Sequence, residues 1–111
     1  MSSSLFDLTG KSALITGSSQ GIGFALAKGL AASGAKIILN GRDRTKLQAA
    51  ADNLSTTGAD VQTLGFDATD HDAVRAAVDG FEDTSGTIDI LVNNAGMQHR
   101  TELENFPADA F

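Results

Sequence analysis

The chain has 111 residues and a formal net charge of -6, and 41% of its residues are hydrophobic and 20% charged. This length and composition fit one small globular domain, or part of a larger one, and exclude both two independent domains and a disordered chain. The negative charge argues against binding to nucleic acid or to an anionic membrane, and the absence of cysteine excludes disulfide bonds, thiolate metal sites and thiol catalysis.

The start of the chain shows no sign of a targeting segment. Met1 to Thr9 is rich in serine and has neither a basic beginning nor a long apolar run. A secretory signal or a membrane anchor needs such a run. We therefore expect a cytoplasmic protein, which also suits the lack of cysteine.

Four short apolar runs predict β-strands. They cover residues 13–15, 35–39, 61–66 and 88–92, the third being the weakest, and each is bounded by Gly, Asn, Asp or Ser. Because these runs are nearly continuous and do not alternate with polar residues, they are typical of parallel strands that are covered on both faces.

Apolar residues at helical spacing fill the gaps between the strands. The three segments run from Ile22 to Leu30, from Leu47 to Leu54 and from Val74 to Phe81, and Ser33-Gly34 forms a stop signal after the first. The resulting order β-α-β-α-β-α-β predicts an α/β fold. We expect a Rossmann-like, doubly wound parallel sheet with right-handed crossovers.

The end of the chain has no strand pattern. After Gly96 the sequence shows only a possible helix start near Pro107-Ala108 before it stops at Phe111. We therefore expect residues 1–111 to form a single domain of about four strands that is incomplete at its C-terminus. One edge of the parallel sheet would then lack a neighbour.

A glycine-rich segment, Thr-Gly-Ser-Ser-Gln-Gly-Ile-Gly at 16–23, leads from the first strand directly into the first helix. In this layout the pyrophosphate of a dinucleotide lies against free amides at a helix N-terminus. Gly17 permits the tight turn, Gly21 lets the backbone approach the phosphates, and Gly23 lets the helix lie close to the sheet. The alternative is a glycine turn without a ligand. The predicted cofactor contacts in this loop are Gly17, Ser18, Gln20, Gly21, Ile22 and Gly23.

Two motifs together resemble the short-chain dehydrogenase/reductase family. They are Thr16-Gly17-x-x-x-Gly21-Ile22-Gly23 and the turn Asn93-Asn94-Ala95-Gly96 after the fourth strand, and the resemblance extends from Leu8 to Phe106. It implies an NAD(P)-dependent oxidoreductase in which Asn94, Ala95 and Gly96 border the cofactor and the turn steadies the sheet. Alone, the second motif would indicate an ordinary Asn-Gly turn.

The residues after the second strand indicate the cofactor. Dinucleotide folds that choose NAD usually place an acid there to hold the ribose 2′-hydroxyl. This chain has Asn40-Gly41-Arg42 instead, so the Arg42 guanidinium can pair with the 2′-phosphate of NADP, and the Ser18 hydroxyl can donate to that phosphate. Two alternatives stay open: Arg42 faces solvent, or Asp43 lies near the ribose and NAD also binds.

Asp67 and Ala68 follow the third strand, where the resemblance implies contacts with the adenine ring. The alternative is that Asp67 caps the next helix. Asp70 is the better candidate for that cap because it stands directly before the helical period.

The catalytic groups are missing from this sequence. The resemblance implies a Ser and a Tyr-x-x-x-Lys pair that lie beyond the Asn-Asn-Ala-Gly turn, and the chain contains no tyrosine. His71 and His99 lack partners for catalysis or metal binding. We therefore predict no catalytic residue and no metal ligand here, and we expect homo-oligomers only of a full-length form.

Residues 93–100 and 39–43 closely resemble gluconate 5-dehydrogenases within the family. Their substrate is a sugar acid, and Arg100 can pair with its carboxylate. Alternatively Arg100 pairs with Glu102 or Glu104. We predict an NADP-preferring oxidoreductase that interconverts D-gluconate and 5-keto-D-gluconate. The alternatives are a 3-oxoacyl-carrier-protein reductase and a non-catalytic dinucleotide-binding module.

Overall fold

Seven elements make up the part of the chain that the structure describes. The structure is a computed structural model, and it describes residues 7–95. In chain order the elements are β1 (Ser12–Ile15), α1 (Gly21–Ala32), β2 (Lys36–Gly41), α2 (Arg44–Ser55), β3 (Val61–Gly65), α3 (His71–Ser85) and β4 (Ile90–Val92). The predicted alternation of strands and helices is confirmed over this range.

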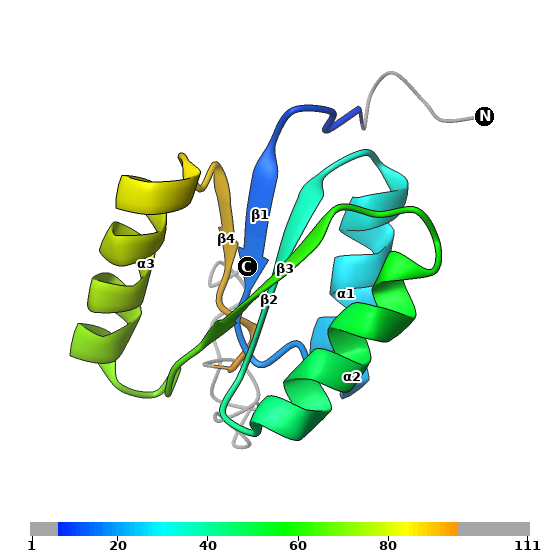
Figure 1. The fold of residues 1–111 in the computed structure, drawn as a ribbon. Helices are drawn as coiled ribbons and strands as arrows, with labels where there is room; N and C mark the ends of the chain where they lie inside the picture. The colour runs from blue at the N-terminus through cyan, green and yellow to red at the C-terminus, as the bar shows by residue number, and fades with distance from the viewer. Residues whose placement is uncertain (1–6, 96–111) are drawn as a thin grey trace, which may run out of the picture.

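The strands form one parallel sheet in the order β3-β2-β1-β4. β1 is central, and its Leu14 lies opposite Ile38 of β2 on one side and Leu91 of β4 on the other. The helices α1 and α2 cover one face of the sheet, and α3 lies on the other face (Figure 1). This arrangement confirms the Rossmann-like, doubly wound α/β fold.

Two strand boundaries differ from the prediction. β4 begins at Ile90 and not at residue 88; just before it, the amide of Ile88 donates to the carboxylate of Glu82 at 2.8 Å. β2 continues to Gly41 instead of ending at residue 39. The extension brings Asn40 and Gly41 into register with the end of β3.

Aspartate caps begin two of the helices. The carboxylate of Asp43 accepts hydrogen bonds from two amides in the first turn of α2, and Asp70 does the same for α3. Such caps satisfy amides that have no partner inside the helix. The prediction that Asp70, and not Asp67, caps this helix is confirmed.

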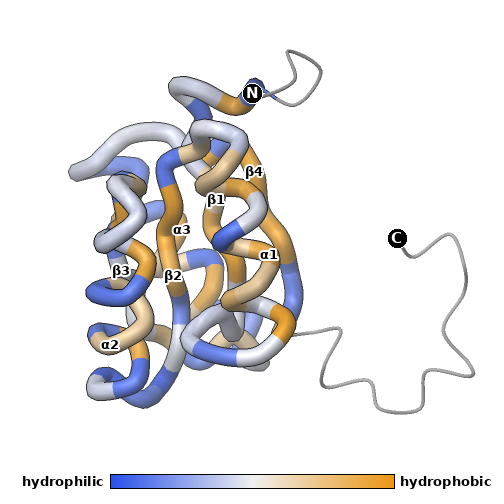
Figure 2. Tube along the Cα trace, turned by 90° about the vertical axis from the view of Figure 1, so that its right-hand side faces the viewer, coloured by the Kyte–Doolittle hydropathy of each residue, from blue (hydrophilic) through white to orange (hydrophobic). Residues whose placement is uncertain are grey.

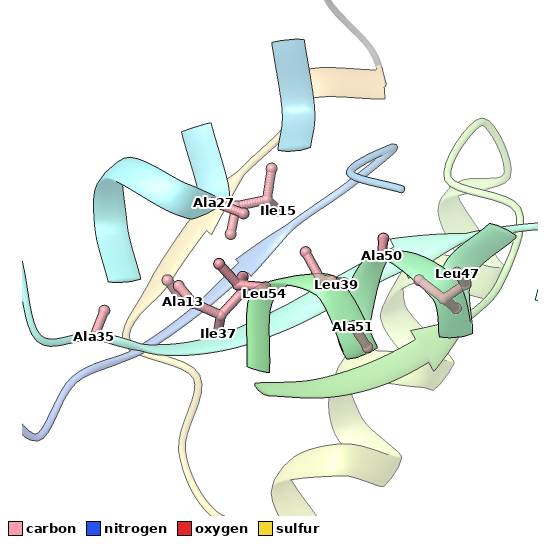
Figure 3. Packing of buried hydrophobic residues seen from close by; sticks show 10 residues of the cluster. All are labelled: Ala13, Ile15, Ala27, Ala35, Ile37, Leu39, Leu47, Ala50, Ala51 and Leu54. Atoms are coloured by element: carbon pink, nitrogen blue, oxygen red, sulfur yellow. The ribbon is translucent and has the colours of Figure 1, made fainter. Parts of the chain in front are cut away.

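The hydrophobic core lies between the sheet and the pair α1 and α2. Figure 2 shows that the hydrophobic parts of the trace run along β1, β2 and β4. Alternate side chains of the central strands point to this face, where small residues of the helices allow close packing. Figure 3 shows the buried cluster: Ala13, Ile15, Ala27, Ala35, Ile37, Leu39, Leu47, Ala50, Ala51 and Leu54.

Coverage of the opposite face is uneven. Leu14 and Ile38 are buried there, but Leu91 is 53% exposed and no residue of α3 is fully buried. The expectation that all four strands are covered on both faces is therefore correct for β1 and β2 and wrong for β3 and β4. These two strands lie at the edges of the described sheet, where fewer side chains surround them.

Candidate dinucleotide site

A cavity of about 220 Å³ lies at the carboxyl edge of the sheet. It is formed where β1, β2 and β3 end and where the turn after β4 begins. The strand order reverses between β1 and β4, and open α/β sheets bind ligands in the crevice at such a point. Its lining residues are Gly17, Ser19, Gln20, Asn40, Gly41, Arg42, Phe66, Asp67, Ala68, Thr69 and Ala95.

A larger cavity of about 420 Å³ lies elsewhere, between the C-terminal parts of α1 and α2. Small and aliphatic side chains dominate its lining, and Lys28 is its charged residue. Its lining includes no residue from the carboxyl ends of the strands or from the glycine loop. We therefore assign the functional site to the smaller cavity.

The glycine loop passes from β1 to α1 along this cavity. Gly17 has a φ of 60°, a backbone conformation that side chains disfavour, and it turns the chain sharply. Gly23 lies on the buried side of α1, where a Cβ would stand 2.6 Å from Asn94 Nδ2 and would also clash with the Gly17 carbonyl. The missing side chain thus lets the helix lie directly against the loop and the turn after β4, whereas the prediction for this position was close packing of the helix on the sheet.

The amino end of α1 differs from those of α2 and α3. Its N-cap residue is Gln20, whose side chain makes no capping hydrogen bond. Its first turn contains no acidic residue. The first amides of α1 and the positive end of its dipole are therefore available to an anion beside the cavity.

Asn40 connects the glycine loop to the ends of β2 and β3. Its side-chain oxygen accepts from the Gly17 amide at 2.9 Å, and its Nδ2 donates to the carbonyls of Leu64 at 2.9 Å and Phe66 at 3.2 Å. The residue is 1% exposed. Although Asn40 lines the cavity, its side-chain amide holds the surrounding backbone in position.

Ser18 has a different position from the one expected. Its side chain is fully buried, and its hydroxyl donates to the Ile15 carbonyl at 2.6 Å and accepts from the Asn40 amide at 2.9 Å. A hydroxyl has one proton to donate. The expected donation from Ser18 to a 2′-phosphate therefore does not agree with the structure, which gives Ser18 a role in holding the loop.

The turn after β4 is fastened to the same loop. The Ala95 amide donates to Thr16 Oγ1 at 3.0 Å, and Asn94 Nδ2 donates to the Gly17 carbonyl at 3.1 Å. Asn93 Oδ1 lies 3.3 Å from the Thr16 hydroxyl, which can donate to it. These contacts hold the second motif against the first, with Ala95 at the wall of the cavity.

Two charged side chains face each other across the cavity mouth. Arg42 Nη1 lies 3.7 Å from Asp67 Oδ2, and the two side chains are 74% and 41% exposed. The amide and hydroxyl of Thr69 donate to Asp67 Oδ1 at 2.9 and 2.6 Å. Chiefly through the hydroxyl bond, Thr69 lowers the pKa of Asp67 below its usual range, and Arg42 adds a smaller effect in the same direction.

The remaining predicted residues either are not part of the cavity lining or lie outside the described range. Gly21 is the first residue of α1, Ile22 is 65% exposed on that helix, and Asn94 is 2% exposed. Gly96 and Arg100, like His99, lie outside the described residues. Four residues of the lining were missed: Ser19, Gly41, Phe66 and Thr69.

Two of the missed residues had a signal in the sequence. Ser19 stands inside the glycine motif, and Gly41 stands where an NAD-binding acid would be sought.

Over residues 7–95, no group of three or more His, Cys, Asp or Glu side chains is placed to hold a metal ion. Within the same range, every helix is too short or too polar to cross a membrane.

Nearly all of the chain is similar to a known family and to known proteins. The family described as short chain dehydrogenase matches residues 11–111. A gluconate 5-dehydrogenase from Gluconobacter oxydans is 50% identical over 92% of this chain, and a 5-keto-D-gluconate 5-reductase from Escherichia coli is 45% identical over 93%. The chain spans about two fifths of these relatives, 40% and 41% of their lengths.

Solved structures agree with this comparison. A gluconate 5-dehydrogenase from Burkholderia cenocepacia, in complex with NADP and tartrate, is 48% identical with a TM-score of 0.77, covering 95% of this chain and 41% of that one. An L-sorbose reductase from Gluconobacter frateurii, complexed with NADPH and L-sorbose, is 42% identical with a TM-score of 0.75, covering 82% and 35%.

Proposed function

The chain belongs to the short-chain dehydrogenase family, and we propose that it is the cofactor-binding part of an NADP-preferring oxidoreductase that interconverts D-gluconate and 5-keto-D-gluconate by hydride transfer. The observation that carries the proposal is the cavity at the carboxyl edge of the sheet, which has the uncapped start of α1 and the Arg42 guanidinium in its surroundings. The similarity to gluconate 5-dehydrogenases supports the substrate class.

The residues around the cavity fit a phosphorylated dinucleotide. The amides at the start of α1, beside Gly17 and Gln20, suit the pyrophosphate because they have no side-chain cap. Asp67 and Ala68 border the same cavity and are assigned to the adenine ring. When bound, the cofactor supplies or accepts the hydride, and the part of the protein described here binds and orients it.

The end of β2 favours NADP over NAD. Gly41 carries no carboxylate that would repel a 2′-phosphate, and the exposed Arg42 guanidinium can pair with that group. Asp43, the alternative contact to the ribose, has its carboxylate engaged at the start of α2. Ser19 borders the cavity next to Gly41 and is a better candidate than Ser18 for a hydroxyl contact.

Catalysis is assigned to residues outside this sequence. We place residues 1–111 in a single NAD(P)-binding domain that is incomplete at its C-terminus. The Gluconobacter oxydans relative aligns with 92% of this chain, whereas the chain spans only 40% of that relative. The sequence contains no tyrosine for proton transfer. The 111 residues alone should bind cofactor without turning over substrate, and homo-oligomers belong to the full-length form.

Binding of the two cofactors to the purified chain tests the proposal. Calorimetric titration should show NADP⁺ binding about tenfold or more tightly than NAD⁺, since a charge-assisted pair with a phosphate contributes about 1.5–3 kcal/mol. Arg42→Ala should weaken NADP⁺ and leave NAD⁺ unchanged, whereas Arg75→Ala on α3 should change neither. Equal affinities, or no binding of either cofactor, would contradict the proposal.

The substrate is tested in a completed enzyme, made by joining the chain to the remaining three fifths of the Gluconobacter oxydans relative. We propose that Arg100 pairs with the carboxylate of the sugar acid. Arg100→Ala should then raise KM for gluconate while leaving KM for NADP⁺ unchanged. A KM for gluconate equal to that of the unmodified fusion would exclude this role for Arg100.

A further inference from the structure

The cavity mouth contains a cation, Arg42, that already has an anionic partner, Asp67, so a bound phosphate would compete with this carboxylate for the guanidinium. Arg42 follows β2 and Asp67 follows β3, two strands that pair in register up to Gly41 and Gly65. Both residues line the cavity, and their side chains form an ion pair of 3.7 Å between Nη1 and Oδ2. An anion that binds Arg42 therefore either shares the guanidinium with Asp67 or draws the guanidinium away from Asp67.

The two side chains of this ion pair differ in how firmly they are held in position. Asp67 is held by two hydrogen bonds from Thr69, one from the amide and one from the hydroxyl, both to Oδ1. These bonds stabilise the carboxylate form, so Asp67 stays ionised at neutral pH. Arg42 is 74% exposed and carries a long side chain, which can leave the pair. The fixed charge is thus the negative one.

Resting on the proposed cofactor function, we propose that Asp67 is a specificity-determining residue that weakens the preference for NADP over NAD by competing with the 2′-phosphate for Arg42. A 2′-phosphate has to draw the guanidinium away from Asp67 and then lies near a fixed carboxylate. A ribose 2′-hydroxyl carries no charge and meets neither cost. Without the carboxylate of Asp67, Arg42 would give a stronger preference for NADP over NAD than the ion pair gives.

The size of the effect follows from the exposure of the pair. Exposed ion pairs stabilise weakly, so releasing Arg42 should change the affinity ratio about two- to fivefold. The ratio of the two cofactor affinities is the useful quantity, because any contact between Asp67 and adenine is common to both cofactors and cancels. Added salt should reduce the difference, since it screens exposed charges.

The test compares Asp67→Asn with the unmodified chain by calorimetric titration of NADP⁺ and NAD⁺. The asparagine keeps an oxygen for the Thr69 bonds and removes the charge. The ratio of the NAD⁺ to the NADP⁺ dissociation constant should rise about two- to fivefold. Asp60→Asn, which removes one charge at the amino end of β3, should leave this ratio unchanged. Asp67→Ser, a second neutral variant, should shift it in the same direction.

An Arg42→Ala background separates competition from simple repulsion. There, Asp67→Asn should raise the ratio less than it does in the presence of Arg42. An unchanged or lower ratio in Asp67→Asn, or an equal rise in both backgrounds, would overturn the inference while leaving cofactor binding intact. Failure of the unmodified chain to bind either cofactor would instead overturn the proposed function and this inference with it.

Discussion

The amide of Gly17 donates a 2.9 Å hydrogen bond to the side-chain oxygen of Asn40, 23 positions further along the chain. The nitrogen of the same side chain donates to the carbonyl of Leu64, which lies in β3, and to that of Phe66, which directly follows this strand. One buried amide therefore sets the relative position of the three segments that border the cavity. The glycine loop depends on a residue outside its own motif.

Asn40→Ala should destabilise the fold and weaken cofactor binding together. The change leaves the Gly17 amide and two carbonyls without their partner, and one unsatisfied buried group costs about 1–3 kcal/mol. Urea unfolding should therefore show a loss of at least that size. Asn53→Ala, at an exposed position of α2, is the control and should stay within about 0.5 kcal/mol. Similar midpoints for the two variants would show that the Asn40 bonds contribute little.

Gly23→Ala should push α1 away from the loop. Its Cβ would lie 2.6 Å from Asn94 Nδ2 and 2.8 Å from Ser18 Cα, and it would also clash with the Gly17 carbonyl. We expect a destabilisation of about 1–3 kcal/mol by urea unfolding, as for other overpacked sites.

Gly29→Ala on the same helix is the matched control. Among residues 7–95, no atom other than those of its chain neighbours and its own helix backbone lies within 4 Å of the added Cβ there. Alanine favours the helix over glycine by about 1 kcal/mol, so this variant should be more stable than the original chain. Equal effects at the two positions would mean that helix propensity, and not close packing, decides the outcome at Gly23.

Much of the fold was predictable because its signals are local. The apolar runs and the helical spacing each lie within a few neighbouring residues, and the carboxylates of Asp43 and Asp70 act on amides two and three positions away. The strand ends were less predictable. The predicted run starts at residue 88, yet β4 begins only at Ile90, and the Ile88 amide instead donates to Glu82, a contact that composition does not reveal.

The candidate site was predictable in outline but not in its contacts. The glycine loop identified the cavity, yet the direction of the Ser18 hydroxyl depends on the Asn40 amide, 22 positions away. Likewise, the pairing of Arg42 with Asp67 depends on the register between β2 and β3. Such contacts follow from how strands are placed side by side, so a motif within one segment does not specify them.

Gly41→Asp should reverse the cofactor preference. A carboxylate at the end of β2 would repel a 2′-phosphate and accept a hydrogen bond from a 2′-hydroxyl. Its Cβ would lie 3.2 Å from Ser19 Oγ, so the new side chain would stand in the lining of the cavity. The ratio of the NAD⁺ to the NADP⁺ dissociation constant should fall about tenfold or more, which corresponds to a change of about 1.4 kcal/mol or more in relative binding free energy.

Gly41→Ala separates the steric part of this change from the electrostatic part. It adds the same Cβ next to Ser19 without a charge. Both cofactors should then lose affinity to a similar extent, and the preference for NADP⁺ should persist. If Gly41→Ala changes the ratio as strongly as Gly41→Asp, crowding at Ser19 and not the carboxylate sets the preference.

Thr69→Val should raise the pKa of Asp67 towards its ordinary value of 3.8, because the hydroxyl bond from Thr69 is the largest cause of the lowered pKa. The Thr69 amide still donates, so part of the effect should remain. In the folded chain this pKa lies below that of the unfolded chain. Asp67 therefore contributes stability above the unfolded pKa, and this contribution disappears as the pH falls through the folded pKa. In Thr69→Val the contribution should be smaller.

Carbon NMR of the Asp67 carboxyl group during an acid titration measures this directly. Asp7 is an internal control, since bonds from Thr9 lower its pKa in the same manner and the substitution is remote from it. The Asp67 midpoint should move upward in Thr69→Val while that of Asp7 stays in place. An unmoved Asp67 midpoint would mean that the hydroxyl does not stabilise the carboxylate, and the fixed negative charge at the cavity mouth would then depend on the Thr69 amide and Arg42 alone.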